Sequence, residues 1–263
     1  MRPQPYIGVT GFMDQADVRE VLFVFPKEAR HKLMVGVLMS NKTLAGQTNK
    51  WPNRYPAKEA VADIFVDHPQ ALNLIHYHTS NSNHAMVMEM VNVMALAGHH
   101  CHGFQLNVRW PYPKAIEDYH RDRRFGIFGH KDDTIVLQVG RGAMEEVDFS
   151  PKRIAERVKD YDGLVSYVLI DPSGGKGEAF DESFAHEVFC ALTGTVPNMG
   201  IGIAGGLAAE SVDKIEGLLT THPDISIDAE GRLRNSDDSL KIGAANHYVV
   251  AANRLFRRYP IAA

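Results

Sequence analysis

The sequence is poor in cysteine and has no long apolar run. Two of its 263 residues are cysteine, Cys101 and Cys190, which excludes a disulfide framework and favours a reducing compartment. No apolar run approaches the roughly 18 residues that a membrane-spanning helix needs, and residues 1–6 lack the apolar core of a signal peptide. We therefore expect a cytoplasmic protein that makes no contact with a membrane.

The sequence also lacks an excess of positive charge and a nucleotide-binding motif. Its 28 Lys and Arg residues stand against 32 Asp and Glu residues, a formal net charge of −4, so we expect no nucleic acid partner. The segment Gly200–Gly205 fits the pattern G-x-G-x-x-G, but its first glycines lie inside an apolar run, whereas a dinucleotide fingerprint follows the strand. We predict no cofactor.

What the chain does contain is an alternation of short apolar runs with amphipathic stretches, repeated eight times. Continuous apolar strands are typical of parallel sheets covered on both faces, and eight such units in about 250 residues favour a closed barrel. We predict an α/β fold, a single (β/α)₈ TIM barrel domain over residues 1–263, with an open doubly wound sheet as the alternative. The expected strands are Tyr6–Thr10, Met34–Ser40, Leu72–His78, Gly103–Trp110, Thr134–Gly140, Leu164–Asp171, Met199–Ala204 and Ile225–Asp228.

An amphipathic helix is expected after each strand. The segment Glu210–Leu219 places its apolar residues on one helical face, and Ser150 followed by Pro151 is typical of a helix start. A long loop, Asn41–Asn53, separates the second strand from its helix. The expected helices are Asp14–Phe23, Ala57–Phe65, His84–Ala97, Lys114–Arg121, Pro151–Tyr161, Glu182–Leu192, Ala209–Thr221 and Ser239–Arg257.

In such a barrel the active site lies at the carboxyl ends of the strands. The sixth strand ends in Asp171, and the loop after it contains Gly174, Gly175 and Gly177. Backbone N–H groups of successive glycines can hold an anion, and a carboxyl at a strand end can act as a general acid or base. The segment therefore predicts a catalytic acid beside an anion-binding loop. A surface loop before a helix capped by Asp181 is the alternative.

Glycines also stand at the ends of the seventh and eighth strands. Gly205 and Gly206 follow the seventh strand, while Asp228 ends the eighth and Gly231 follows it. Loops at these two places commonly hold a phosphate group in barrels. We predict a phosphate site there, with ordinary turn glycines as the alternative.

His76 and His78 lie two residues apart in the third strand, so their side chains share a face. Two imidazoles at a barrel mouth can bind a divalent metal, contact a substrate or transfer a proton, and they can equally be structural. Because no third ligand stands at a decisive spacing, we predict no metal site. A metal-dependent hydrolase or aldolase that uses both histidines is kept as an alternative.

Taken in chain order, these segments resemble the phosphoribosylanthranilate isomerases, single-domain (β/α)₈ enzymes of tryptophan biosynthesis. The resemblance spans most of the chain and is densest over residues 164–231. The similar segments are Leu169–Asp171, Gly174–Gly177 and Phe180–Asp181 (L-L-D, G-G-T-G and F-D-W in the family), Ala204–Leu207 (A-G-G-L), Ile227–Gly231 (V-D-V-S-S-G), Arg54–Tyr55 (S-R-Y) and Gln105–Leu106 (Q-L-H-G).

The resemblance implies an Amadori-type rearrangement, in which an aldose aminated at C1 becomes a ketose. It also implies that Asp171 is the acid, that Arg54 holds a carboxylate of the substrate and that the glycine turns hold its phosphate. Thr10, however, stands where the family has its cysteine base, and a threonine hydroxyl is a poor base near pH 7. His78 and Asp228 are the candidates to replace it.

A second departure is Glu230, an anion at the turn that the resemblance assigns to phosphate. We predict an isomerase-like enzyme that acts on a phosphorylated sugar or a small phosphorylated metabolite. A barrel that binds a small ligand or a partner without catalysis is the alternative. Since such barrels often pair, a homodimer is a further expectation.

Overall fold

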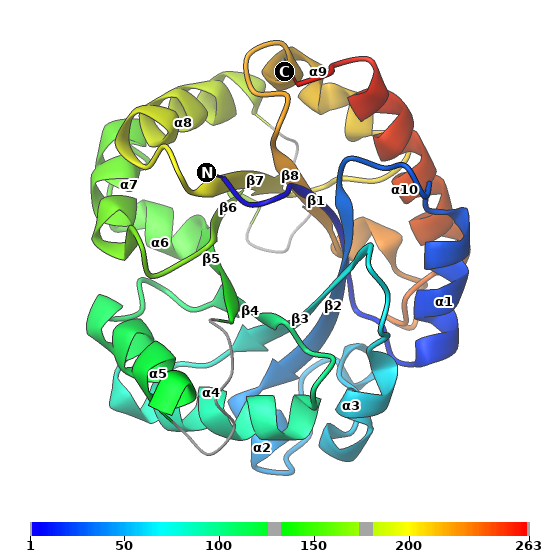
Figure 1. Ribbon diagram of the computed structural model, residues 1–263, viewed down its shortest axis with the longest axis vertical. Coiled ribbons are helices and arrows are strands. Elements are labelled where there is room, and N and C mark those ends of the chain that lie inside the picture. The colour runs from blue at the N-terminus through cyan, green and yellow to red at the C-terminus, as the bar shows by residue number, and fades with distance from the viewer. Residues whose placement is uncertain (1, 126–132, 174–180, 262–263) are drawn as a thin grey trace.

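The computed structural model describes residues 2–125, 133–173 and 181–261, and in it eight parallel strands close into a barrel (Figure 1). Consecutive strands are neighbours all the way round, and β1 pairs with both β2 and β8. The predicted (β/α)₈ barrel is confirmed, and the open doubly wound sheet is wrong. The strands are β1 (Tyr6–Thr10), β2 (Lys32–Ser40), β3 (Ala71–His78), β4 (Gly103–Asn107), β5 (Thr134–Gly140), β6 (Tyr167–Asp171), β7 (Gly200–Ala204) and β8 (Ser226–Ala229).

Helices surround the barrel, and within the described residues none is long and apolar enough to cross a membrane. The α-helices are α1 (Gln15–Val24), α2 (Asn41–Leu44), α3 (Val61–Ile64), α4 (His84–Ala97), α5 (Pro113–Phe125), α6 (Arg141–Glu145), α7 (Pro151–Val158), α8 (Glu182–Thr195), α9 (Glu216–Leu219) and α10 (Ile242–Arg257). Short 3₁₀ helices are η1 (Pro52–Arg54), η2 (Lys58–Ala60), η3 (Lys159–Tyr161), η4 (Val212–Ile215) and η5 (Gly231–Leu233).

Several helix predictions are corrected by the structure. The expected helix Ala57–Phe65 is instead the 3₁₀ helix η2 followed by the four-residue α3. The expected helix Ala209–Thr221 is instead the 3₁₀ helix η4 followed by the four-residue α9. Its apolar residues recur every three positions, a spacing that a 3₁₀ helix also satisfies. The segment Asn41–Asn53, expected as a loop, begins with α2, because Ser40 and Thr43 form a capping box around its first turn.

Side chains of the strands alternate between two apolar clusters. One fills the space between the sheet and the helices, and a smaller one fills the barrel interior. The interior cluster fills the barrel toward the amino-terminal ends of the strands. The polar side chains that also point inward lie farther along the strands, toward their carboxyl ends. The interior cluster consists of Tyr6, Met34, Leu72, Leu74, Val136, Tyr167, Leu169 and Ala204.

Candidate functional site

A cavity of about 880 Å³ opens at the carboxyl ends of the strands. Its size lies within the range of small-molecule sites, which is roughly 300–1,000 Å³. Most of the residues expected from the sequence line it, and Thr10 lies beneath it against a lining residue. The expected residues in the lining are Arg54, His78, Asp171, Gly205, Gly206, Asp228 and Gly231. The predicted anion-binding glycines Gly174, Gly175 and Gly177 lie outside the described residues.

Asp228, at the end of β8, is the most deeply placed carboxyl of the cavity. Its side chain is buried and accepts hydrogen bonds from Thr10 Oγ1 (3.1 Å) and from Gln105 Nε2 (3.0 Å). Burial raises the pKa of Asp228 to about 7, although the hydrogen bonds from Gln105 and Thr10 oppose that rise. A carboxyl with this pKa exists in both protonation states at neutral pH.

Two glycines leave space for the hydrogen-bonded side chains of Thr10 and Asp228. A Cβ atom at Gly8 of β1 would lie 2.6 Å from Asp228 Oδ1, and one at Gly36 of β2 would lie 2.5 Å from Thr10 Oγ1. Both distances are too short for non-bonded atoms. The interior of the barrel can therefore hold the Thr10–Asp228 pair only because positions 8 and 36 carry no side chain.

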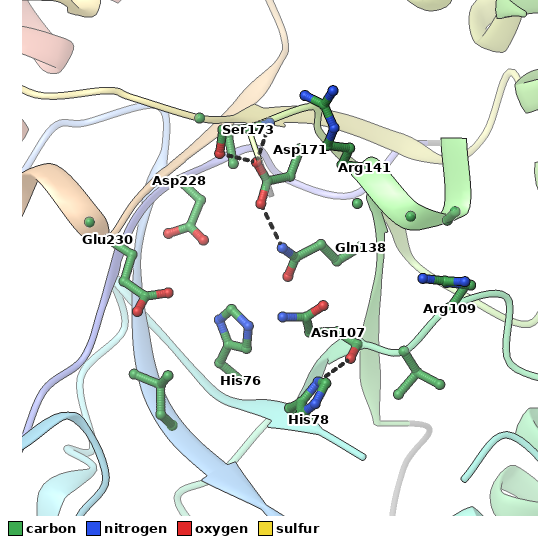
Figure 2. A pocket seen from close by; sticks show the side chains of 18 of the residues that line it. His76, His78, Asn107, Arg109, Gln138, Arg141, Asp171, Ser173, Asp228 and Glu230 are labelled. Atoms are coloured by element: carbon green, nitrogen blue, oxygen red, sulfur yellow. Dashed lines mark hydrogen bonds between the residues drawn. The ribbon is translucent and has the colours of Figure 1, made fainter. Parts of the chain in front are cut away.

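A row of amide side chains connects Asp228 with Asp171 across the barrel. Gln105 Nε2 lies 3.2 Å from Gln138 Oε1, and Gln138 Nε2 donates to Asp171 Oδ2 at 2.9 Å. Asp171 Oδ1 accepts a further hydrogen bond from Ser173 Oγ at 2.7 Å, which fixes the orientation of the carboxyl. Figure 2 shows the side chains of Asp228, Gln138 and Asp171 directed toward the same space.

The amide of Gln105 links three polar side chains. Its Nε2 donates to Asp228 Oδ2 at 3.0 Å and to Gln138 Oε1 at 3.2 Å, and it lies 3.4 Å from His76 Nδ1. Its two protons are thus taken up by the two oxygen acceptors.

The two histidines of β3 have different surroundings. Burial lowers the pKa of His76, which favours a neutral ring. His78 is exposed, and its Nδ1 lies 3.0 Å from the carbonyl oxygen of Asn107. Since a carbonyl only accepts, His78 Nδ1 carries a proton, which leaves Nε2 as the ring nitrogen that can exchange a proton with a ligand. Among the described residues, three metal-ligating side chains come together only at His186, Cys190 and His222, outside this cavity, so the metal-dependent hydrolase hypothesis gains no support here.

Glu230 belongs to a cluster of four charged side chains at the rim. Its Oε1 accepts from Arg234 Nη2 at 3.1 Å and lies 3.4 Å from Arg54 Nη1, and Arg54 also pairs with Asp238. Two positive charges thus balance two negative charges, which reduces the opposition of Glu230 to a bound phosphate. The cluster also joins η1, which follows β2, to the segment after β8.

The backbone turn after β7 is one that only glycine adopts readily. Gly205 has a φ of +112° and Gly206 a φ of +66°. A Cβ at Gly205 would lie 3.2 Å from Ser173 Cβ, so this turn packs closely against the end of β6. Arg109, Arg141 and Arg232 also line the cavity and contribute positive charge around it.

Four residues of the site were not predicted as site residues: Gln105, Gln138, Ser173 and Arg234. A signal existed for the two glutamines, because each stands between two apolar residues of a strand and so points to the opposite face from them. No pattern pointed to Arg234, whose side chain is 3% exposed and whose Nη2 donates to the carbonyl oxygen of Thr10 at 3.2 Å. That contact joins residues 224 positions apart in the chain.

Comparisons with protein-family models and with curated protein sequences give no match. Solved structures do match. Phosphoribosyl anthranilate isomerase from Thermus thermophilus is similar with a TM-score of 0.64 and 14% identity, over 95% of this chain and 99% of that one. A phosphoribosyl anthranilate isomerase in complex with reduced 1-(o-carboxyphenylamino)-1-deoxyribulose 5-phosphate is similar with a TM-score of 0.62 and 13% identity, over 94% and 98%.

The catalytic domain of a hyperthermophilic chitinase from Pyrococcus furiosus is also similar, with a TM-score of 0.55 and 10% identity, over 100% of this chain and 99% of that one. Since a barrel with a different name matches along its whole length, the likeness concerns architecture rather than chemistry. The resemblance of the sequence is thus confirmed at the level of the fold: this chain is a (β/α)₈ barrel similar to the phosphoribosylanthranilate isomerase structures.

Proposed function

We propose that this barrel isomerises a phosphorylated aldose or aldosylamine to the corresponding ketose, with Asp228 as the base and Asp171 as the acid. The observation that carries the proposal is the hydrogen bond between Asp228 and Thr10. By resemblance, position 10 is where a cysteine base acts. A titratable carboxyl in direct contact with that position can take over the proton transfer that a threonine hydroxyl cannot perform.

The proposed reaction needs two groups of opposite function. One protonates the ring oxygen so that the sugar opens, and the other removes the proton from C2, after which C1 gains a proton as the carbonyl forms at C2. Asp228, whose pKa burial raises to about 7, has a basic form available at neutral pH. Asp171, at the other end of the Gln105–Gln138 row, lines the same cavity and supplies the second carboxyl.

His78 is the other candidate for the base, because the contact of its Nδ1 with Asn107 leaves Nε2 as the ring nitrogen that can exchange a proton. We assign the base to Asp228 for two reasons. Asp228 is buried, whereas His78 is exposed to water, which competes for a proton in transit. Asp228 also contacts the position of the missing cysteine, and His78 is hydrogen-bonded to the backbone of β4 instead.

An anionic substrate is supported by the charges around the cavity. Four arginines line it, against three carboxyl residues. Gly205, Gly206 and Gly231 would approach the phosphate with their backbone N–H groups. Arg54 would hold a second anionic group of the substrate, in competition with Asp238 and Glu230, to which it is bound here. The carboxyphenyl group named in the complex of the similar isomerase is one such group.

The test is turnover of phosphoribosylanthranilate, followed by the loss of its anthranilate-type fluorescence, together with a panel of phosphorylated aldoses followed by ketose formation. Asp228→Asn and Asp171→Asn should each lower kcat by about 10²–10⁴-fold, as expected for a general base or acid. Asp67→Asn, an exposed site before β3, is the matched control and should leave kcat unchanged.

Turnover that survives Asp228→Asn but not His78→Gln would move the base to His78. If the wild-type protein converts no substrate of the panel yet binds 1-(o-carboxyphenylamino)-1-deoxyribulose 5-phosphate, the proposal fails and the barrel is a binding protein.

A further inference from the structure

Three soft ligand groups meet on the outside of the barrel, away from the cavity. His186 and Cys190 belong to α8, and His222 lies before β8. Cys190 Sγ is 3.8 Å from His186 Nδ1 and 3.9 Å from His222 Nε2, and the three ligand atoms all lie within 4.8 Å of one another.

The fold itself brings these side chains together. His186 and Cys190 are four residues apart in α8, so they lie on the same helical face one turn apart. His222 is buried, with its ring nearly perpendicular to that of Phe189 at a centroid distance of 5.7 Å. The backbone N–H of His222 donates to Leu218 at 2.8 Å. One ligand is therefore held firmly, and two exposed ones face it.

A hydrogen bond between Cys190 and one histidine would not by itself explain why two imidazole nitrogens lie close to the same sulfur atom. A thiol has one proton to donate, so it can serve only one of the two imidazole nitrogens as donor. A thiolate with two neutral imidazoles is instead a donor set that zinc prefers over magnesium or calcium. We propose that His186, Cys190 and His222 form a zinc-binding site.

The distances agree with a site that contracts slightly on binding. With Zn–N near 2.0–2.1 Å and Zn–S near 2.3 Å, tetrahedral ligand atoms are about 3.3–3.6 Å apart. The two separations from Cys190 Sγ exceed this range by a few tenths of an ångström, and the ligand atoms of His186 and His222 lie no more than 4.8 Å apart. Rotations of the exposed His186 and Cys190 side chains would bring the three ligand atoms to the separations of a bound ion. Three protein ligands leave one position of the ion for water.

The location of the site indicates a structural role. His222 precedes the first residue of β8, so the cluster is on the amino-terminal side of the strands, whereas the cavity is at their carboxyl ends. The amino-terminal end of a (β/α)₈ barrel contributes to stability rather than to catalysis. A bound ion would tie α8 to the segment before β8 and would stabilise the folded state by binding to it preferentially.

The experiment is a titration of the full chain with Co²⁺ and Zn²⁺ in the presence of a reductant that does not bind metals. Co²⁺ should give a thiolate-to-metal charge-transfer band in the near ultraviolet at one equivalent, and Zn²⁺ should displace it. Cys190→Ser should abolish the band although Cys101 remains. His186→Gln changes an exposed side chain and should weaken Zn²⁺ binding by at least about 100-fold, because loss of a direct ligand costs more than loss of an outer partner.

His99→Gln, an exposed histidine outside the cluster, is the matched control and should leave affinity unchanged. At a Zn²⁺ concentration 100-fold above Kd, the wild-type Tm should rise by about 5 °C or more, and that of Cys190→Ser should not. The proposal is overturned if no thiolate band forms, or if the band and the affinity are the same in the wild type, Cys190→Ser and His186→Gln.

Discussion

Thr10 and Asp228 are bound to each other at the base of the cavity, with Thr10 Oγ1 donating to Asp228 Oδ1 at 3.1 Å. The contact changes what the first strand contributes. A hydroxyl cannot take a proton from a carbon acid, but it can stabilise the carboxylate beside it. If Asp228 is the base, Thr10 is a positioning residue that also sets the pH range in which Asp228 is deprotonated.

The raised pKa of Asp228 makes the stability of the protein depend on pH. In the unfolded chain this carboxyl returns to the ordinary value of 3.8, whereas in the folded state its pKa is about 7. The folded state therefore binds the proton more tightly, and this advantage is full below pH 4 and lost as the pH rises through 7.

Between pH 4 and pH 8 the wild type should lose up to about 4 kcal/mol of unfolding free energy relative to Asp228→Asn, which cannot ionise. Urea unfolding of both proteins at the two pH values measures the difference. Parallel changes with pH in the two proteins would show that Asp228 does not titrate in this range.

Thr10→Val removes the hydroxyl but keeps the shape of the side chain. Because the hydrogen bond from Thr10 lowers the pKa of Asp228, its loss should raise that pKa further, and the inflection of kcat/KM against pH should move up by about one unit. Thr10→Ser keeps the donor and should restore the wild-type profile. A fall in rate without a shifted profile would mean that Thr10 acts on packing alone.

Arg54 forms an ion pair with Asp238, so removing either partner should change the KM for an anionic substrate, and in opposite directions. Asp238→Asn releases Arg54 from a competing carboxylate and should lower KM. Arg54→Met removes a charge-assisted hydrogen bond and should raise KM by about tenfold or more with a smaller change in kcat. Arg19→Met, on the outer helix α1, is the control. Equal KM values in all the variants would remove Arg54 from the binding site.

Gly36→Ala should disturb the site from below. The added Cβ would lie 2.5 Å from Thr10 Oγ1 and 3.0 Å from Thr10 Cα, so backbone and side chain must both shift. We expect a loss of about 1–3 kcal/mol in unfolding free energy and a marked loss of activity. Gly243→Ala, in α10 with nothing within 4 Å, should be neutral or slightly stabilising. Denaturant unfolding of both variants checks the contrast.

The barrel itself could be predicted from the sequence, because apolar strands and amphipathic stretches follow each other without interruption. Two strands, β1 and β5, begin and end where predicted, and the other bounds shift by at most three residues. The shift at the start of β6 arises because the apolar residues Leu164 and Val165 precede the paired part of the strand. The short helices η4 and α9 were less predictable, because apolar residues that recur every three positions are compatible with both an α-helix and a 3₁₀ helix.

The candidate site could be predicted only in part. Strand ends identified His78, Asp171 and Asp228 as residues of one cavity, and the structure brings them together there. The contacts among the side chains depend on register, which no local pattern encodes: His76 is opposite Gln105, and only this register places the Gln105 amide beside Asp228. The link from Arg234 to Thr10 depends on closure of the barrel and is not a property of either segment.

The two glycines beneath the site have a consequence for how this barrel can change. Gly8 and Gly36 weaken their own strands, since glycine is a poor strand residue, yet any larger side chain collides with Thr10 or Asp228. The residues allowed at positions on β1, β2 and β8 therefore depend on one another. A chain that keeps Asp228 and Thr10 must keep both glycines, whereas a larger residue at position 8 requires a change at Asp228 and a shift of Met34, and one at position 36 requires a change at Thr10.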